Sequence, residues 1–132
     1  MSRLWNRREV EQFARNTLGC GCPDKVFEKI NIDRIENSGQ GGTISRVDIG
    51  NTLLVYIVRP ESNKELHNSV ARIVSQGRED RDSNGFNRFR LVVAGEAKEL
   101  DGETAIKAFA GEIGTDEKMH LHFVSTDAVD GL

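Results

Sequence analysis

Residues 52–58 read TLLVYIV, a run of β-branched, aliphatic and aromatic side chains that contains no charge. Such a run is typical of a strand buried on both faces, and it predicts the central strand of a sheet. Gly50 and Asn51 directly precede it and are typical of the two-residue turn of a β-hairpin. Residues 44–49, with three apolar side chains, predict the other strand of that hairpin. An antiparallel hairpin is therefore the first element of the predicted sheet.

A helix is predicted on the C-terminal side of the central strand. Residues 62–65 read Ser-Asn-Lys-Glu, which is a capping box. Gly77 is predicted to end this helix. Residues 86–94 then predict a strand buried on both faces, and a right-handed crossover through the helix would make it parallel to the central strand. The apolar residues at helical spacing are Leu66, Val70, Ile73 and Val74.

Two more helices, one short helix and two more strands complete the predicted elements. The first helix is capped by Asn6, runs from Arg7 and ends at Gly19; the last helix lies between Asp101 and Gly114. A short helix of about two turns is predicted over residues 24–30. The remaining strands are predicted over residues 31–35 and 119–124.

This order of elements predicts an α/β (or α+β) fold. We expect a single domain over residues 1–132: a mixed sheet of about five strands with an antiparallel hairpin, covered by three main helices, and a frayed tail over residues 126–132. An unpaired buried carboxylate costs several kcal/mol, so Val55→Asp is expected to unfold the domain. The predicted core residues are Leu54, Val55, Ile57, Leu66, Val70, Ile73, Leu91, Val93, Phe109 and Leu121.

Composition and charge restrict the classes of partner. Lys and Arg total 18 against 21 Asp and Glu in 132 residues, a formal net charge of -3, so no overall attraction to nucleic acid or to an anionic membrane is expected. The first residues lack the apolar run of a signal peptide, and no apolar stretch is long enough to span a membrane. We therefore expect a cytoplasmic protein, monomeric or homodimeric, with a protein partner.

The two cysteines of the chain lie together in the stretch Gly19-Cys20-Gly21-Cys22-Pro23. Pro23 is typical of the first position of a helix, which makes Cys22 the predicted N-cap. A thiolate is stabilised at a helix N-terminus, so Cys22 is predicted to be more acidic and more nucleophilic than Cys20. A disulfide between them would close too short a loop to stabilise the fold.

Three interpretations of this dithiol stay open. In the first, Cys22 attacks a disulfide or an electrophile and Cys20 resolves the mixed disulfide, which is thiol-disulfide redox chemistry. The Cys-Gly-Cys tripeptide resembles the dithiol sites of some thiol-disulfide oxidoreductases, although the strand that precedes a thioredoxin-type motif is absent. In the second, the cysteines bind a metal. In the third, they only help the chain to turn between two helices, without a cofactor.

The metal interpretation adds His120 and His122, which alternate on one face of the last predicted strand. Two thiolates and two imidazoles would complete a tetrahedral zinc site with Cys20 and Cys22. Both pairs are separated by one residue, whereas two to four residues are usual between zinc ligands. An iron-sulfur cluster is a further alternative, which would need four ligands or a dimer that shares two cysteines from each chain.

A binding module without chemistry is the remaining class. Arg81, Arg88 and Arg90 lie close in sequence to Phe86 and Phe89, the mixture of cations and aromatic rings that grips phosphate or single-stranded nucleic acid. Acidic residues over 79–82 offset much of that charge. No sequence motif of a known catalytic triad is present, so the sequence does not decide whether the protein is an enzyme.

Overall fold

The computed structural model describes residues 7–19, 24–36, 43–60, 63–95 and 102–129. The five strands form one mixed sheet in the order β1-β2-β3-β4-β5. β2 is antiparallel to β1 and β3, while β3, β4 and β5 are parallel to one another. The predicted fold class, hairpin and parallel strands are therefore confirmed. The strands are β1 (Ile30–Glu36), β2 (Thr43–Ile49), β3 (Leu53–Val58), β4 (Arg88–Ala94) and β5 (Met119–Val124).

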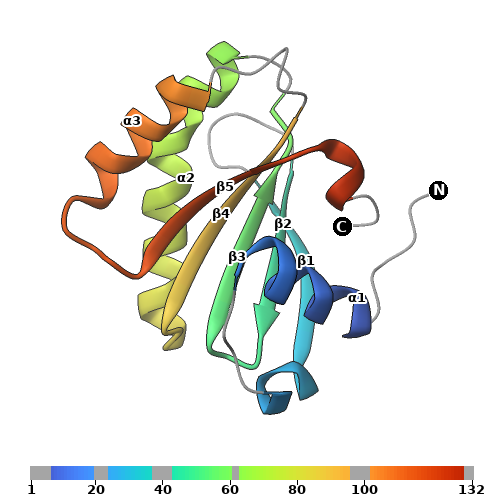
Figure 1. Ribbon diagram of the computed structural model, residues 1–132. Helices are drawn as coiled ribbons and strands as arrows, with labels where there is room; N and C mark the ends of the chain where they lie inside the picture. The colour runs from blue at the N-terminus through green and yellow to red at the C-terminus, as the bar shows by residue number, and fades with distance from the viewer. Residues whose placement is uncertain (1–6, 20–23, 37–42, 61–62, 96–101, 130–132) are drawn as a thin grey trace.

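Helices cover both faces of this sheet (Figure 1). α2 (Asn63–Asn84) and α3 (Gly102–Ile113) lie side by side on one face. α1 (Arg7–Gln12) continues into the π-helix η1 (Phe13–Thr17) and lies on the other face. Within the described ranges, no helix is long and apolar enough to cross a membrane. The predicted caps Asn6, Ser62 and Asp101 lie outside these ranges.

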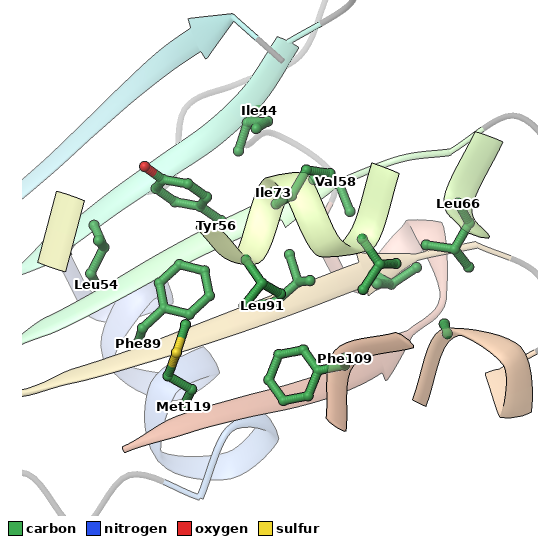
Figure 2. Close-up of a cluster of buried hydrophobic side chains, with 14 of the residues drawn as sticks. Ile44, Leu54, Tyr56, Val58, Leu66, Ile73, Phe89, Leu91, Phe109 and Met119 are labelled. Carbon is green, nitrogen blue, oxygen red and sulfur yellow. The ribbon is translucent and has the colours of Figure 1, made fainter. Parts of the chain in front are cut away.

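The sheet separates two hydrophobic clusters. One lies under α1 and η1 and contains Phe13, Phe27 and Val55. The other lies under α2 and α3 and contains Leu54, Tyr56 and Phe89 (Figure 2). Of the ten predicted core residues, nine are buried and Leu121 is half-buried against the second cluster. Because strand side chains alternate, successive residues of β3 enter opposite clusters, which explains why the whole strand is apolar.

The β2–β3 turn has the predicted hairpin geometry. Gly50 has φ of 60° and Asn51 has φ of 55°, and Thr52 N donates to Ile49 O at 3.0 Å. Two consecutive positive φ angles define a type I′ turn, whose twist matches that of the strands. A Cβ atom at Gly50 would also overlap the backbone of Val26, so glycine is required there for space as well.

The predicted end of the long helix is wrong. α2 continues past Gly77 to Asn84 and ends at Gly85, which has φ of 74°. Phe86 N then donates to Arg81 O at 3.0 Å, the bond that closes a Schellman motif. Gly77 instead lies against the ring of Phe89, where a Cβ atom would overlap the ring carbons. Its role is to let α2 approach the sheet closely.

Gly77→Ala is expected to lower the free energy of unfolding by about 1 to 3 kcal/mol, because overpacking against Phe89 outweighs the roughly 1 kcal/mol gain in helix propensity. Gly111→Ala in α3 is the matched control, since a Cβ atom there meets nothing within 4 Å. That variant should gain stability. Urea unfolding of both variants checks the pair, and equal effects would contradict the close approach at Gly77.

Two shorter segments also differ from their predictions. The predicted two-turn helix over residues 24–30 is a five-residue 3-10 helix, η2 (Asp24–Glu28), because Ile30 already pairs with β2 as the start of β1. The described part of the tail that was expected to fray is a 3-10 helix, η3 (Thr126–Val129). Val129 is buried, and its carbonyl accepts a hydrogen bond from Arg59 Nη2 at 3.0 Å. Residues 130–132 lie outside the described ranges.

Candidate functional site

Two arginines and two histidines lie on the α1 face of the sheet. Strand alternation places Arg88 and Arg90 of β4 on that face, and His120 and His122 of β5 beside them. The parallel register pairs Arg90 with Val55 on one side and with His120 on the other. We call Arg88, Arg90, His120 and His122 the basic cluster.

Arg90 has no anionic partner among the residues that the structure describes. Its Nη1 donates to Nε2 of His122 at 2.8 Å, while its buried Nε has no hydrogen-bond partner in the described part of the chain. Burial, and then the positive charge of Arg88, lower the pKa of Arg90 from its ordinary value. A guanidinium nevertheless stays charged in proteins, so Arg90 is a half-buried cation with unused donor capacity.

Burial and the neighbouring guanidinium groups favour the neutral form of both histidines in the basic cluster. Arg90 can only donate, so Nε2 of His122 accepts and its ring proton lies on Nδ1. Burial, then Arg90, then His120 lower the pKa of His122 to about 4. Burial, then Arg90 and Arg88, also lower the pKa of His120, whose buried Nε2 has no partner among the described residues. The basic cluster thus carries two guanidinium charges.

We expect His122 to titrate at about pH 4 in the folded protein, against 6.5 for an ordinary histidine. As the pH falls from about 6.5 to about 4, the unfolded chain takes up a proton that the folded protein excludes, so the free energy of unfolding falls. An NMR titration of the His122 ring measures the pKa. Urea unfolding of His122→Gln should show a weaker loss of stability over the same window. A His122 pKa near 6.5 would contradict the neutral acceptor described above.

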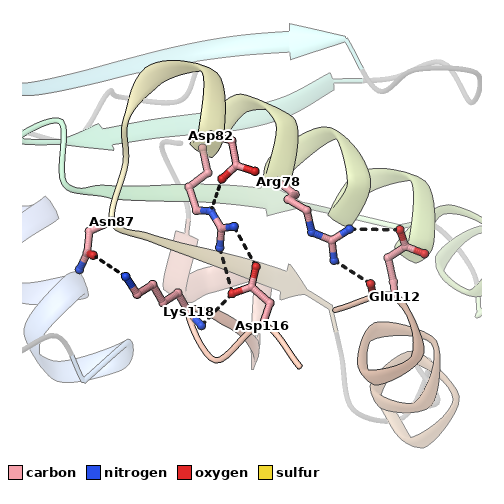
Figure 3. A network of polar contacts seen from close by, with 7 residues as sticks. Arg78, Asp82, Asn87, Glu112, Asp116 and Lys118 are labelled. Atoms are coloured by element: carbon pink, nitrogen blue, oxygen red, sulfur yellow. Dashed lines mark hydrogen bonds and ion pairs between the residues drawn. The ribbon is translucent and has the colours of Figure 1, made fainter. Parts of the chain in front are cut away.

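The arginines of α2 that face α3 are, by contrast, paired with acidic side chains (Figure 3). Arg78 donates to the carbonyl of Glu112 at 2.7 Å and lies 3.7 Å from its carboxylate. Arg81 forms an ion pair with Asp116 at 2.8 Å. The Arg81 hydrogen bond keeps the pKa of Asp116 below its usual value. These pairs tie α2 to α3 and to the segment before β5, and they have a structural role.

A second polar cluster lies half-buried between α2 and the sheet. Asp80 of α2 accepts two hydrogen bonds from Arg46 of β2, at 2.7 and 2.8 Å, and one from the hydroxyl of Tyr56 at 2.5 Å. Asn84 donates to the same carboxylate at 2.8 Å. Burial and then the hydrogen bond to Asp80 raise the pKa of Tyr56 far above its ordinary value. The phenol is therefore a permanent donor in this cluster.

An open pocket of about 420 Å³ lies over this polar cluster. Arg46, Tyr56 and Asp80 contribute to its lining, but their polar groups are already bonded to one another. A ligand would have to break those bonds to use them. The pocket is therefore a weaker candidate site than the basic cluster, in which donors are unused.

The arginines and phenylalanines that lie close in sequence over residues 81–90 do not share one surface in the described structure. Phe86 and Phe89 are buried on the α2 side of the sheet, and Phe89 packs edge-on against Tyr56 at 5.1 Å between ring centroids. Arg88 and Arg90 lie on the opposite face, and Arg81 is paired with Asp116. Neighbours along a strand point to opposite faces, and this separates the cations from the rings.

The predicted cysteine site falls outside the described residues. Cys20 and Cys22 are both in the range 20–23, whereas His120 and His122 share one face of β5, as their spacing predicts. No three His, Cys, Asp or Glu side chains gather as a metal site in the ranges that the structure describes. The zinc and iron-sulfur interpretations stay predictions, as does the redox role. The charge of Arg90 beside His122 disfavours a cation at that ring.

Comparison with protein-family models, with curated proteins and with solved structures finds no match for this chain.

Sequence reasoning missed the basic cluster, although a signal for it was present. Arg88 and Arg90 alternate on one predicted strand, and His120 and His122 alternate on the next. These strands were expected to be parallel, so the four side chains could have been placed together on one face. Sequence could not show that Arg90 has no acidic partner in the described ranges, because that depends on where the carboxylates of distant elements lie.

Proposed function

We propose that this protein is a binding module that holds an anionic group of a partner at the basic cluster. The observation that carries the proposal is the half-buried guanidinium of Arg90, whose Nε is buried and unbonded and which has no carboxylate partner among the described residues. Buried charges in proteins are normally paired, because desolvation of an unpaired ion is costly. A ligand anion would supply the missing partner.

The chemistry of the basic cluster suits a carboxylate or a phosphate group. Arg90 contributes a half-buried guanidinium charge whose Nε is buried, and the exposed side chain of Arg88 adds a second charge on the same face. A neutral imidazole can also donate a hydrogen bond, and the Nε2 of His120 has no partner in the described ranges. Charge-assisted bonds of this kind are short and strong. The attraction is local, because the chain as a whole carries a formal charge of -3.

Binding of small anions tests this function. Calorimetric titration with citrate as a carboxylate probe and with pyrophosphate as a phosphate probe should show saturable binding at low ionic strength. Arg90→Gln should weaken it by roughly 10- to 100-fold, because a hydrogen bond to a charged group contributes about 1.5 to 3 kcal/mol.

Arg72→Gln is the matched control for charge. Arg72 is also half-buried with an unbonded Nε, but it lies on α2, where its Nη2 bonds the helix carbonyl of Asn68 at 3.4 Å. This variant should bind the probes as the wild type does. Absence of binding in the wild type, or equal losses in both variants, would contradict the proposal.

Thiol-disulfide chemistry at Cys20 and Cys22, in the cytoplasm, is the second candidate function. It is supported by the flanking residues: Gly19 has φ of 70°, and η2 begins at Asp24, so the tripeptide falls between two helical segments. The 3-10 helix is too short for a strong dipole, which reduces the acidity expected for Cys22. Faster alkylation of Cys22 than of Cys20 near neutral pH would support this function, and two inert thiols would exclude it.

A further inference from the structure

We propose that the partner is an extended peptide segment of alternating acidic and apolar residues, and that it binds along the outer edge of β5 as an additional strand. This rests on the proposed function, because the basic cluster supplies the contacts for the acidic side chains. Three features of β5 support it: its outward backbone groups, its lack of edge protection, and the different chemistry of its two faces.

The backbone of β5 presents alternate residues to the outer edge. Phe89 N donates to Lys118 O at 2.9 Å, and Gly95 N donates to Val124 O at 3.0 Å. These bonds show that the even-numbered residues of β5 turn their backbone groups towards β4. Leu121 and Phe123 therefore turn their N–H and C=O groups outward, where β5 pairs with no further strand in the described chain.

The two edges of the sheet differ in their protection against further pairing. β1, at the opposite edge, has exposed Asp33 and Arg34 in the middle of the strand. Charged side chains of this kind keep edge strands from pairing with another chain. β5 reads MHLHFV and contains neither Lys, Asp, Glu nor Pro, and burial lowers the pKa of both its histidines. Its edge therefore remains suitable for an added strand.

The two faces beside this edge differ in chemistry. The α1 face carries the basic cluster, with His120 and His122 on β5 itself. The opposite face, which α2 and α3 cover, carries the two large apolar side chains that are exposed in the described chain, Phe123 at 40% and Ile106 at 53%. Side chains of an added strand alternate between these faces. Acidic residues would thus reach the basic cluster, while apolar residues would cover Phe123 and Ile106.

Amide hydrogen exchange in the presence of a designed peptide tests this inference. The probe is a short peptide, blocked at both ends, in which glutamate and valine alternate. Its binding should slow exchange at the Leu121 and Phe123 amides by at least about tenfold, because these amides become hydrogen-bonded. A control peptide of the same composition, with its glutamates grouped at one end, should give no such protection.

Two variants separate this inference from the proposed function. Phe123→Ser should weaken the alternating peptide at least fivefold and leave citrate binding unchanged, whereas Arg90→Gln should weaken both ligands. Lys107→Ser, at an exposed position of α3, is the control for folding and should bind the peptide as the wild type does.

Each other outcome has a defined meaning. If citrate binds but the peptide does not protect Leu121 and Phe123, the edge inference is wrong and the anion site stands. If neither ligand binds, the proposed function fails first. Protection that rises with protein concentration in the absence of peptide would assign this edge to a second copy of the chain and overturn the inference.

Discussion

Leu54→Asp is expected to leave no cooperatively folded protein. Leu54 is fully buried in β3, and its register neighbours are Asp48 of β2 and Phe89 of β4, so the new carboxylate would meet a like charge and a ring. An unpaired buried carboxylate costs several kcal/mol, which is comparable to the whole stability of a typical domain. Circular dichroism during urea unfolding measures this, with Leu54→Met as the volume-conserving control. A normal unfolding transition would contradict the assigned burial.

The neighbouring substitution Val55→Asp has a different expected result. The sequence alone predicts that it unfolds the domain, but the register places Val55 directly beside Arg90 on the α1 face. A carboxylate at residue 55 would therefore supply an anion to the unpaired guanidinium. Val55→Asp should retain more stability than Leu54→Asp and should lose citrate binding, because its own carboxylate competes for Arg90.

Asp80→Ala is expected to lower the free energy of unfolding by about 1.5 to 3 kcal/mol, the range for hydrogen bonds to a charged group, because this ion pair is half-buried. Without this carboxylate, Arg46 and the hydroxyl of Tyr56 lose their shared acceptor between α2 and the sheet. Asp82→Ala is the control on the same helix. The Asp82 side chain is 63% exposed, so its pair with Arg81 should contribute at most about 1 kcal/mol. Equal losses in the two variants would contradict the structural role of Asp80.

The stability lost in Asp80→Ala depends on pH, because it follows from the ionisation of Asp80. Burial alone would raise the pKa of this carboxyl, but hydrogen bonds from Arg46 and Tyr56 hold it below 3.8. Its stabilising effect is therefore fully present above that pH and is lost as the pH falls through the lower folded-state pKa. The difference in the free energy of unfolding between the wild type and Asp80→Ala should accordingly become smaller in acid.

The fold was predictable because its signals are local. The apolar run of β3, the Gly50-Asn51 turn and the alternation in β5 each lie within a few residues, and the five strands follow from such patterns. The end of α2 was not predictable in this way. Gly77 resembles a glycine that ends a helix. Glycine is needed there because α2 packs closely against Phe89, and no local pattern reveals that contact.

The polar clusters were less predictable than the fold. Arg46 and Asp80 are 34 residues apart, and no spacing rule connects β2 to the last turns of α2. For the basic cluster the alternation was visible in sequence, but the absence of a described acidic side chain beside Arg90 was not. The unsatisfied donor is a property of the packed structure, and it is the feature on which the proposed function depends.

The most direct test of the anion site follows the Arg90 Nε–H group by NMR during titration with citrate. The structure predicts a saturable shift of this resonance and slower exchange of its proton, together with a shift of the His120 ring, while the paired Nε–H of Arg46 and the exposed ring of His67 stay unchanged. A titration in which the Arg90 Nε–H group does not respond would contradict the assignment of the basic cluster as an anion site.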